Sequence, residues 1–220
     1  MLLALAVPAF WPDYLARPAA ADAYTHAHAL LGLAWLALIV VQPLLVRAGR
    51  VALHRRLGRC GVAVGAAFVV VGVLLTHHRA SRMSADAFAR EGFHFYLPLA
   101  MAVIFAAALA LAWRWRRWPA LHARYMAATM LPLIDPVTAR LLHFYAPPLP
   151  GHFAYQLPAF TIVTVTLLAL LRSLPARAPG RGEFGAFTAA TVAVLALYFA
   201  TPYSATWLQW LQGFRSVPLT

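Results

Sequence analysis

Residues 25–46 read THAHALLGLAWLALIVVQPLLV and include no Asp, Glu, Lys or Arg. An α-helix that crosses the hydrocarbon core of a bilayer needs about 20 mainly apolar residues. The stretch therefore predicts a membrane-spanning helix. Further mainly apolar stretches lie at 57–78, 93–113, 122–144, 155–172 and 184–201. The sequence thus predicts an all-α fold, a polytopic transmembrane helix bundle of about six spans.

The composition separates this chain from a soluble protein. Of its 220 residues, 63% are hydrophobic and 11% are charged, whereas a soluble domain carries about 25% charged residues. The net charge is +12, and its Arg residues lie in short segments between the apolar stretches. That placement is typical of membrane topology and not of a nucleic-acid-binding surface. We therefore expect a lipid bilayer, and no nucleic acid, as partner.

The distribution of Arg predicts the orientation of the bundle. Loops with an excess of Lys and Arg stay in the cytoplasm. One set of alternate loops carries Arg47, Arg50, Arg55, Arg56, Arg59, Arg114, Arg116, Arg117, Arg124, Arg172, Arg177 and Arg181. The opposite set carries Arg17, Arg79, Arg82, Arg90 and Arg215. The first set is expected in the cytoplasm of a bacterium, which places both termini on the periplasmic side of its inner membrane.

Both ends of the chain are expected at the membrane surface. Residues 1–23 are interpreted as an N-terminal interfacial or half-inserted segment, because the apolar run at 1–10 is too short to span. No basic region precedes that run, which argues against a removed signal peptide. The helical bundle is expected over residues 24–201. A periplasmic interfacial tail containing Trp207 and Trp210 is expected over 202–220.

The fourth predicted span carries charged residues and two prolines. Pro132 interrupts helical hydrogen bonding, and Asp135-Pro136 favours a new helix start with Asp135 as N-cap. The span is therefore expected to be kinked or broken there. Irregular backbone in a membrane needs protein or a wet cavity around it. We expect a polar pocket with Asp135 and Arg140, and Gln42 of the first span is either a third member or an interhelical hydrogen-bond donor.

Histidine is concentrated at the predicted periplasmic face. Imidazole is the commonest metal ligand, and two opposed imidazoles can ligate haem iron. The candidate haem ligands are His28 and His94 at this face and His54 and His122 at the opposite face. The candidate metal ligands are His26, His77, His78 and His143, and His152 lies on the same side. Alternatively, these side chains lie where helices meet water, and His54 and His122 contact lipid phosphate or a partner subunit.

Signatures of nucleotide and hydrolytic chemistry are absent from the sequence. There is no Gly-rich phosphate loop, no His-Glu-x-x-His and no Gly-x-Ser-x-Gly. The lone Cys60 excludes an internal disulfide and a Cys-based metal site. Neither class of enzyme therefore has support from a motif.

A set of short motifs runs through most of residues 10–145. They are Phe10-Trp11-Pro12-Asp13-Tyr14, Tyr24-Thr25-His26-Ala27-His28, Trp35, Gln42, LHRRLG at 53–58, His122-Ala123-Arg124-Tyr125-Met126, and a helix with Pro136 and Arg140. In these motifs the chain resembles a widespread family of small bacterial membrane proteins of unknown function. The resemblance implies a helical bundle. Family members often carry a full apolar helix before Phe-Trp-Pro, of which this sequence has the tail, and Gly where Ala29 stands here.

Three functions are compatible with these observations. The first is a haem- or metal-binding redox protein that uses haem b or a His-ligated metal ion for electron transfer, with a quinone as one partner. A looser resemblance to cytochrome b561-like haem bundles favours it, and it would make the protein an oxidoreductase. The second is a non-catalytic accessory subunit or assembly factor of a respiratory or photosynthetic complex. The third is a small-molecule carrier with a pocket around Asp135.

Overall fold

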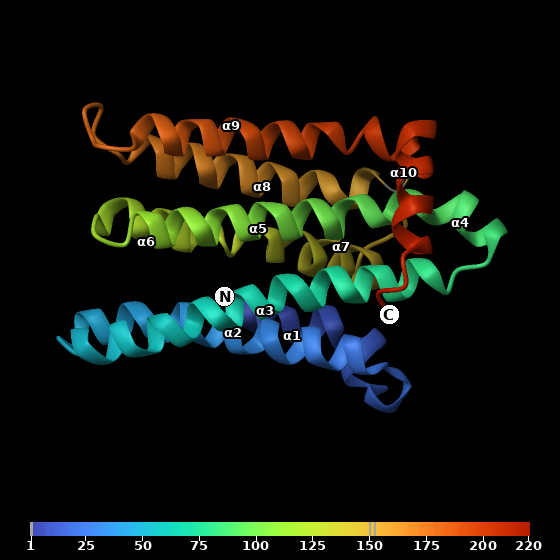
Figure 1. Cartoon of the computed structure of the whole chain (residues 1–220), viewed down its shortest axis with the longest axis horizontal. Helices are drawn as coiled ribbons and strands as arrows, with labels where there is room; N and C mark the ends of the chain where they lie inside the picture. The colour runs from blue at the N-terminus through green and yellow to red at the C-terminus, as the bar shows by residue number, and fades with distance from the viewer. Residues whose placement is uncertain (1, 150, 152) are drawn as a thin grey trace. The chain divides into compact units, whose positions relative to one another are not determined.

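The computed structural model describes residues 2–149, 151 and 153–220 as helices joined by short turns (Figure 1). The predicted all-α fold is confirmed, and the architecture is that of a multi-pass membrane protein. His152 lies outside the described residues. Helices long and apolar enough to cross a membrane occupy α2 (Ala23–Arg47), α3 (Val51–Ser81), the segment Ala85–Arg114, α8 (Phe153–Arg172) and the segment Arg181–Tyr203.

The predicted fourth span is divided into pieces. It consists of α6 (Pro119–Ala128), the 3-10 turn η4 (Leu131–Leu133) and α7 (Ile134–Tyr145). Pro132 has no N–H to donate, and the N–H of Leu133 bonds to the carbonyl of Met130 with the shorter 3-10 spacing. The predicted break is confirmed. It also explains why this segment is not among the long continuous helices.

Helix α7 begins two residues earlier than the sequence predicted. Its first residue is Ile134, and the preceding Leu133 already has helical backbone angles (φ −85°, ψ −11°). The helix therefore needs no separate start at Asp135, and the prediction that Asp135 is the N-cap is wrong. Asp135 lies in the first turn instead, where a carboxylate is favourable near the unbonded N–H groups.

One of two structural units consists of residues 22–109 and 198–220. Helices α2 and α3 pair along their length and are joined by a turn at Gly49 (φ +71°). Trp35 of α2 is almost fully buried, and its ring lies 5.1 Å from that of Phe105. A Cβ at Gly65 of α3 would lie 2.9 Å from the Trp35 ring. The absence of a side chain at Gly65 therefore lets the two helices approach closely.

The same unit contains shorter elements around the end of α3. They are α4 (Ala85–Glu91), η3 (Gly92–Phe95), the first part of α5 (Tyr96–Arg114), η5 (Thr201–Tyr203) and α10 (Ala205–Ser216). Leu211 of α10 is fully buried in a cluster with Ala80, Phe88 and Phe95. This apolar contact holds α10 against α3, α4 and η3.

The other unit consists of residues 1–21 and 110–197. It contains α1 (Leu2–Phe10), η1 (Trp11–Leu15), η2 (Pro18–Ala20), the last turn of α5, and α6 to α9, where α9 is Arg181–Leu197. Helix α7 packs against both α1 and α8, and α8 packs against α9. Tyr125 of α6 is fully buried against the rings of Phe184 and Phe187.

Candidate functional site

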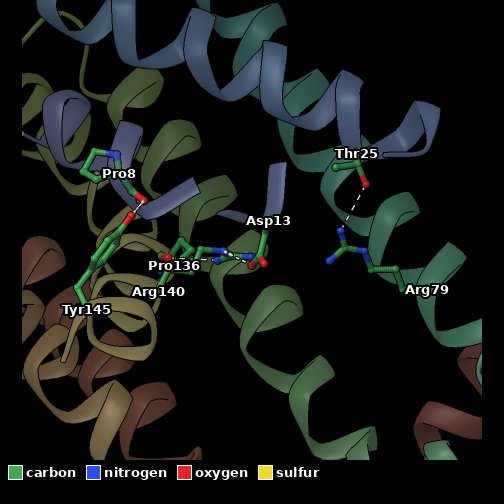
Figure 2. A network of polar contacts seen from close by, with 7 residues as sticks. All are labelled: Pro8, Asp13, Thr25, Arg79, Pro136, Arg140 and Tyr145. Atoms are coloured by element: carbon green, nitrogen blue, oxygen red, sulfur yellow. Dashed lines mark hydrogen bonds and ion pairs between the residues drawn. The ribbon is translucent and has the colours of Figure 1, made fainter. Parts of the chain in front are cut away.

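A polar network links the N-terminal segment to α7 (Figure 2). The Nε of Arg140 lies 3.8 Å from an Asp13 carboxylate oxygen, and one terminal nitrogen donates to the carbonyl of Pro136 at 3.1 Å. The guanidinium lies 4.6 Å from the centre of the Phe10 ring. Two motifs of the family resemblance, at residues 10–14 and at Arg140, thus form one arrangement.

Tyr145 and Asp135 lie at opposite ends of α7. The Tyr145 hydroxyl donates to the carbonyl of Pro8 at 3.1 Å, which is a second link between α7 and α1. Asp135 is 9% exposed, and its Oδ1 has no hydrogen-bond partner in the described part of the chain. Of the two charged residues predicted to form a pocket, Arg140 is bound to the N-terminal segment and Asp135 remains a buried carboxylate.

Arg124 and His122 hold helix ends in the unit that contains residues 110–197. Arg124 donates to the carbonyls of Leu170 (3.1 Å) and Ser173 (2.9 Å) at the carboxyl end of α8. The last carbonyls of a helix lack partners within it, so an Arg there stabilises the end. Nδ1 of His122 lies 2.9 Å from the carbonyl of Ala112 near the end of α5. Both motif residues therefore join elements of the bundle.

Arg181 has a similar role that sequence reasoning missed. One of its terminal nitrogens donates to the carbonyl of Leu171 (2.8 Å), in the last turn of α8, and to the carbonyl of Leu174, which lies just beyond that helix. In the sequence, Arg181 lies in the loop before the predicted span at 184–201, where it indicates only the topology. Arg181 follows the end of one predicted span and precedes the start of the next. A basic side chain in such a position can bind the last carbonyls of the first helix, and this pattern could have indicated the contact.

Gln42 joins α2 to α3 in the unit that contains residues 22–109. With its amide oriented to satisfy its neighbours, Gln42 donates to the carbonyl of His54 at 3.2 Å and to Nδ1 of His54 at 2.5 Å. It also accepts from the N–H of Gly58 at 3.0 Å. His54 and Gly58 are the partners of one i to i+4 helical hydrogen bond, so the amide of Gln42 bridges them from the neighbouring helix.

Replacing Gln42 with leucine is expected to lower the free energy of unfolding by about 1 kcal/mol. The loss is modest because hydrogen bonds between membrane helices contribute about 0.6 kcal/mol on average, and the groups on α3 can still pair with each other. Denaturation in detergent measures it. Gln209→Leu, at an exposed position of α10, is the matched control and should leave stability unchanged. Equal stability of both variants would remove this role of Gln42.

His28 lies in the interface between α2 and α3. Its ring stacks on Phe68 with centroids 4.4 Å apart, and a Cβ at Gly72 would lie 3.1 Å from the imidazole. Gly72 therefore provides the room that the imidazole occupies. The Nδ1 of His28 is buried and has no hydrogen-bond partner among the described residues.

His77 is the most buried of the candidate metal ligands, with 1% of its surface exposed. Its Nδ1 lies 2.7 Å from the Thr220 hydroxyl, and its ring is edge-on to Phe214 at 5.1 Å. Its Nε2 is buried without a hydrogen-bond partner in the described chain. The segment after α10 therefore covers this imidazole.

The other candidate His residues contact aromatic rings or lie at a helix start. The His78 ring is 4.8 Å from Tyr24, and the His94 ring is 3.9 Å from Phe93. The His143 ring lies 5.9 Å from Tyr155, and His26 is in the first turn of α2. His143 and His122 belong to one unit, and His26, His28, His54, His77, His78 and His94 belong to the other.

Asp22 caps α2 at the boundary of the first span. One carboxylate oxygen accepts from the Thr25 N–H at 2.8 Å and the other from the Thr25 hydroxyl at 3.1 Å. The same hydroxyl accepts from Arg79 at 3.3 Å (Figure 2). Partial burial raises the pKa of Asp22, but the Thr25 hydrogen bonds and the charges of His78 and Arg79 outweigh it, so the pKa is lowered from its ordinary value.

Replacing Asp22 with alanine is expected to cost about 1 kcal/mol of stability at neutral pH. Because the folded-state pKa is lowered, the charge contributes fully above the unfolded pKa and the contribution is lost as pH falls through the folded one. The gap between wild type and Asp22→Ala, measured by thermal unfolding, should therefore shrink below about pH 4. Asp22→Asn should keep most of the cap and lose its pH dependence. A constant gap down to pH 3 would contradict this.

No group of three or more His, Cys, Asp or Glu side chains within residues 2–149, 151 and 153–220 is placed to hold a metal ion. The chain matches no family model, no curated protein and no solved structure.

Proposed function

We propose that this chain is an inner-membrane protein that acts as a non-catalytic accessory subunit or assembly factor of a larger membrane complex. The observation that carries the proposal is that polar side chains of the sequence motifs bind the backbone of the helices. Gln42, Arg124 and Arg140 each donate to backbone carbonyls within their own unit. Side chains used in this way stabilise an arrangement of helices and supply no reactive group, which favours a structural role over catalysis.

Affinity purification from the native host tests this function. The tagged full-length chain, expressed from its own locus and extracted in a mild detergent, should retain the same partner subunits in a fixed molar ratio. An unrelated multi-span protein with the same tag is the control for detergent carry-over. Recovery of the chain alone in several mild detergents would contradict the proposal.

The proposed orientation places the Arg-rich loops in the cytoplasm and both termini in the periplasm. Arg82 and Arg177 are exposed and lie in loops assigned to opposite sides. In a Cys60→Ala background, Arg82→Cys should react with a membrane-impermeant maleimide on intact cells with a permeable outer membrane. Arg177→Cys should react only after lysis. The reverse pattern would invert the orientation.

A second candidate is a redox protein that binds haem b or a metal ion. The specific observation in its favour is that Nδ1 of His28 and Nε2 of His77 are buried and unpartnered among the described residues. The fit is poor, because His28 faces Phe68 and His77 faces Phe214, and a pair of axial imidazoles would require both aromatic rings to move. A reduced-minus-oxidised spectrum of the purified chain decides it. A Soret band that disappears in His28→Leu would favour this candidate over the accessory role.

A further inference from the structure

A cleft beside α10 is lined by residues that the proposed function does not use. It has a volume of about 510 Å³ and lies between the end of α3, α4 and α10. Its polar lining includes Ser81, Gln212, Arg215 and Ser216, and its apolar lining includes Phe88 and Leu208. The volume is within the range of small-molecule sites, and the lining combines one cation with neutral polar groups and an apolar wall.

Arg215 is the cation of this cleft and is held at its wall. One terminal nitrogen donates to the carbonyl of Met83 at 2.9 Å, and the guanidinium carbon lies 4.5 Å from the centre of the Phe88 ring. No carboxylate among the described residues forms an ion pair with Arg215, and Asp86 and Glu91 of α4 are exposed to solvent. The guanidinium therefore has donors to spare and no carboxylate partner in the described part of the chain.

Helix α10 has the character of a helix that lies at a membrane surface. It directly follows the segment Arg181–Tyr203, which is long enough to span. Trp210 is exposed, and its ring stacks between those of Trp207 and Phe214, which also pack on the buried cluster around Leu211, with centroids 5.2 and 5.6 Å apart. Tryptophan is enriched at the depth of lipid headgroups. At about 100° per residue, Arg215 lies between Phe214 and the exposed Gln212 around the helix.

We propose that this cleft binds the phosphate group of an anionic phospholipid. The free nitrogens of Arg215 provide a planar fork that matches two phosphate oxygens, and the Gln212 amide adds a further donor. Phe88 and Leu208 form the wall against which the glycerol backbone and the first acyl carbons would pack. The lipid, and not free phosphate, is the expected ligand because the exposed Trp210 and the preceding span-length segment Arg181–Tyr203 favour a position of the cleft at the bilayer surface.

The experiment measures which lipid lies next to α10 in nanodiscs. A fluorophore is attached at Gln209→Cys in a Cys60→Ala background, since Gln209 is exposed and outside the cleft. Quenching by brominated phosphatidylglycerol is compared with quenching by brominated phosphatidylcholine at equal mole fraction. We expect about fivefold preferential association of phosphatidylglycerol, the effect of one Arg near an anionic surface. Arg215→Gln should abolish this preference, and Arg90→Gln, on the exposed side of α4, should keep it.

Three outcomes test whether the ligand is a lipid or free phosphate and whether Arg215 and Gln212 bind it. Preference retained in Arg215→Gln would overturn the proposal, and loss of the preference in millimolar inorganic phosphate would assign the cleft to free phosphate. Because Arg215 also contacts Phe88 and Met83, its loss could detach α10. Gln212→Leu leaves those contacts intact and should still reduce the preference about twofold, whereas an unchanged preference in this variant would count against the site.

Discussion

Gly180→Ala is expected to lower the free energy of unfolding by about 3 kcal/mol. Gly180 has φ +73°, and a Cβ there would lie 2.5 Å from Leu121 and 2.7 Å from Trp115. The unfavourable backbone conformation costs about 1 kcal/mol and the overlap with packed side chains a further 1–3 kcal/mol. The measurement is denaturant or thermal unfolding of the full chain in detergent.

Gly49→Ala is the matched control for Gly180→Ala. Gly49 has almost the same backbone angle (φ +71°), but nothing lies within 4 Å of a Cβ placed there. Gly49→Ala should therefore lower the free energy of unfolding only by the cost of the backbone conformation, about 1 kcal/mol. Equal losses in the two variants would show that the side chains around Gly180 are not packed as described.

Arg124→Ala is expected to cost about 3 kcal/mol, comparable to the loss at Gly180. Besides the carbonyls of Leu170 and Ser173, Arg124 donates to the Ser173 hydroxyl at 2.8 Å and to the carbonyl of Ala120 at 2.7 Å. Hydrogen bonds from a charged donor contribute about 1.5–3 kcal/mol each, and partial exposure reduces their sum. Thermal unfolding in detergent measures the loss.

Two further variants separate the hydrogen bonds of Arg124 from its charge. Arg124→Lys keeps the charge, but the lysine ammonium lacks the planar fork with which the guanidinium reaches several acceptors at once. This variant should therefore recover less than half of the stability lost in Arg124→Ala. Arg177→Ala removes an exposed Arg from the adjacent loop and should change stability by less than about 0.5 kcal/mol. Full recovery by lysine would show that charge alone explains the effect.

The helices could be predicted from the sequence because their cause is local. A run such as residues 25–46 has no charged side chain, and in a bilayer its backbone must satisfy its own hydrogen bonds. The break at Pro132 was also predictable, since a missing N–H acts on its own helix. The start of α7 was predicted two positions late, because the 3-10 turn before it already had helical angles.

The partners of the polar residues could not be predicted in the same way. Arg140 meets Asp13 and Arg124 meets Ser173 across large separations in the chain, and no periodicity encodes such contacts. The charge pattern identified Arg124 as a topology signal, but its contacts with the end of α8 depend on how helices pack. The roles of Arg181 and Arg215 were missed for the same reason.

Native mass spectrometry of the tagged full chain, released from its native membrane, tests the central claim most directly. One measurement reads both the mass of any bound cofactor and the stoichiometry of any partner. The accessory role predicts a complex of fixed composition that dissociates to give this chain at the mass of its polypeptide alone. A chain that is free of partners and carries the additional mass of a haem or metal ion would contradict it.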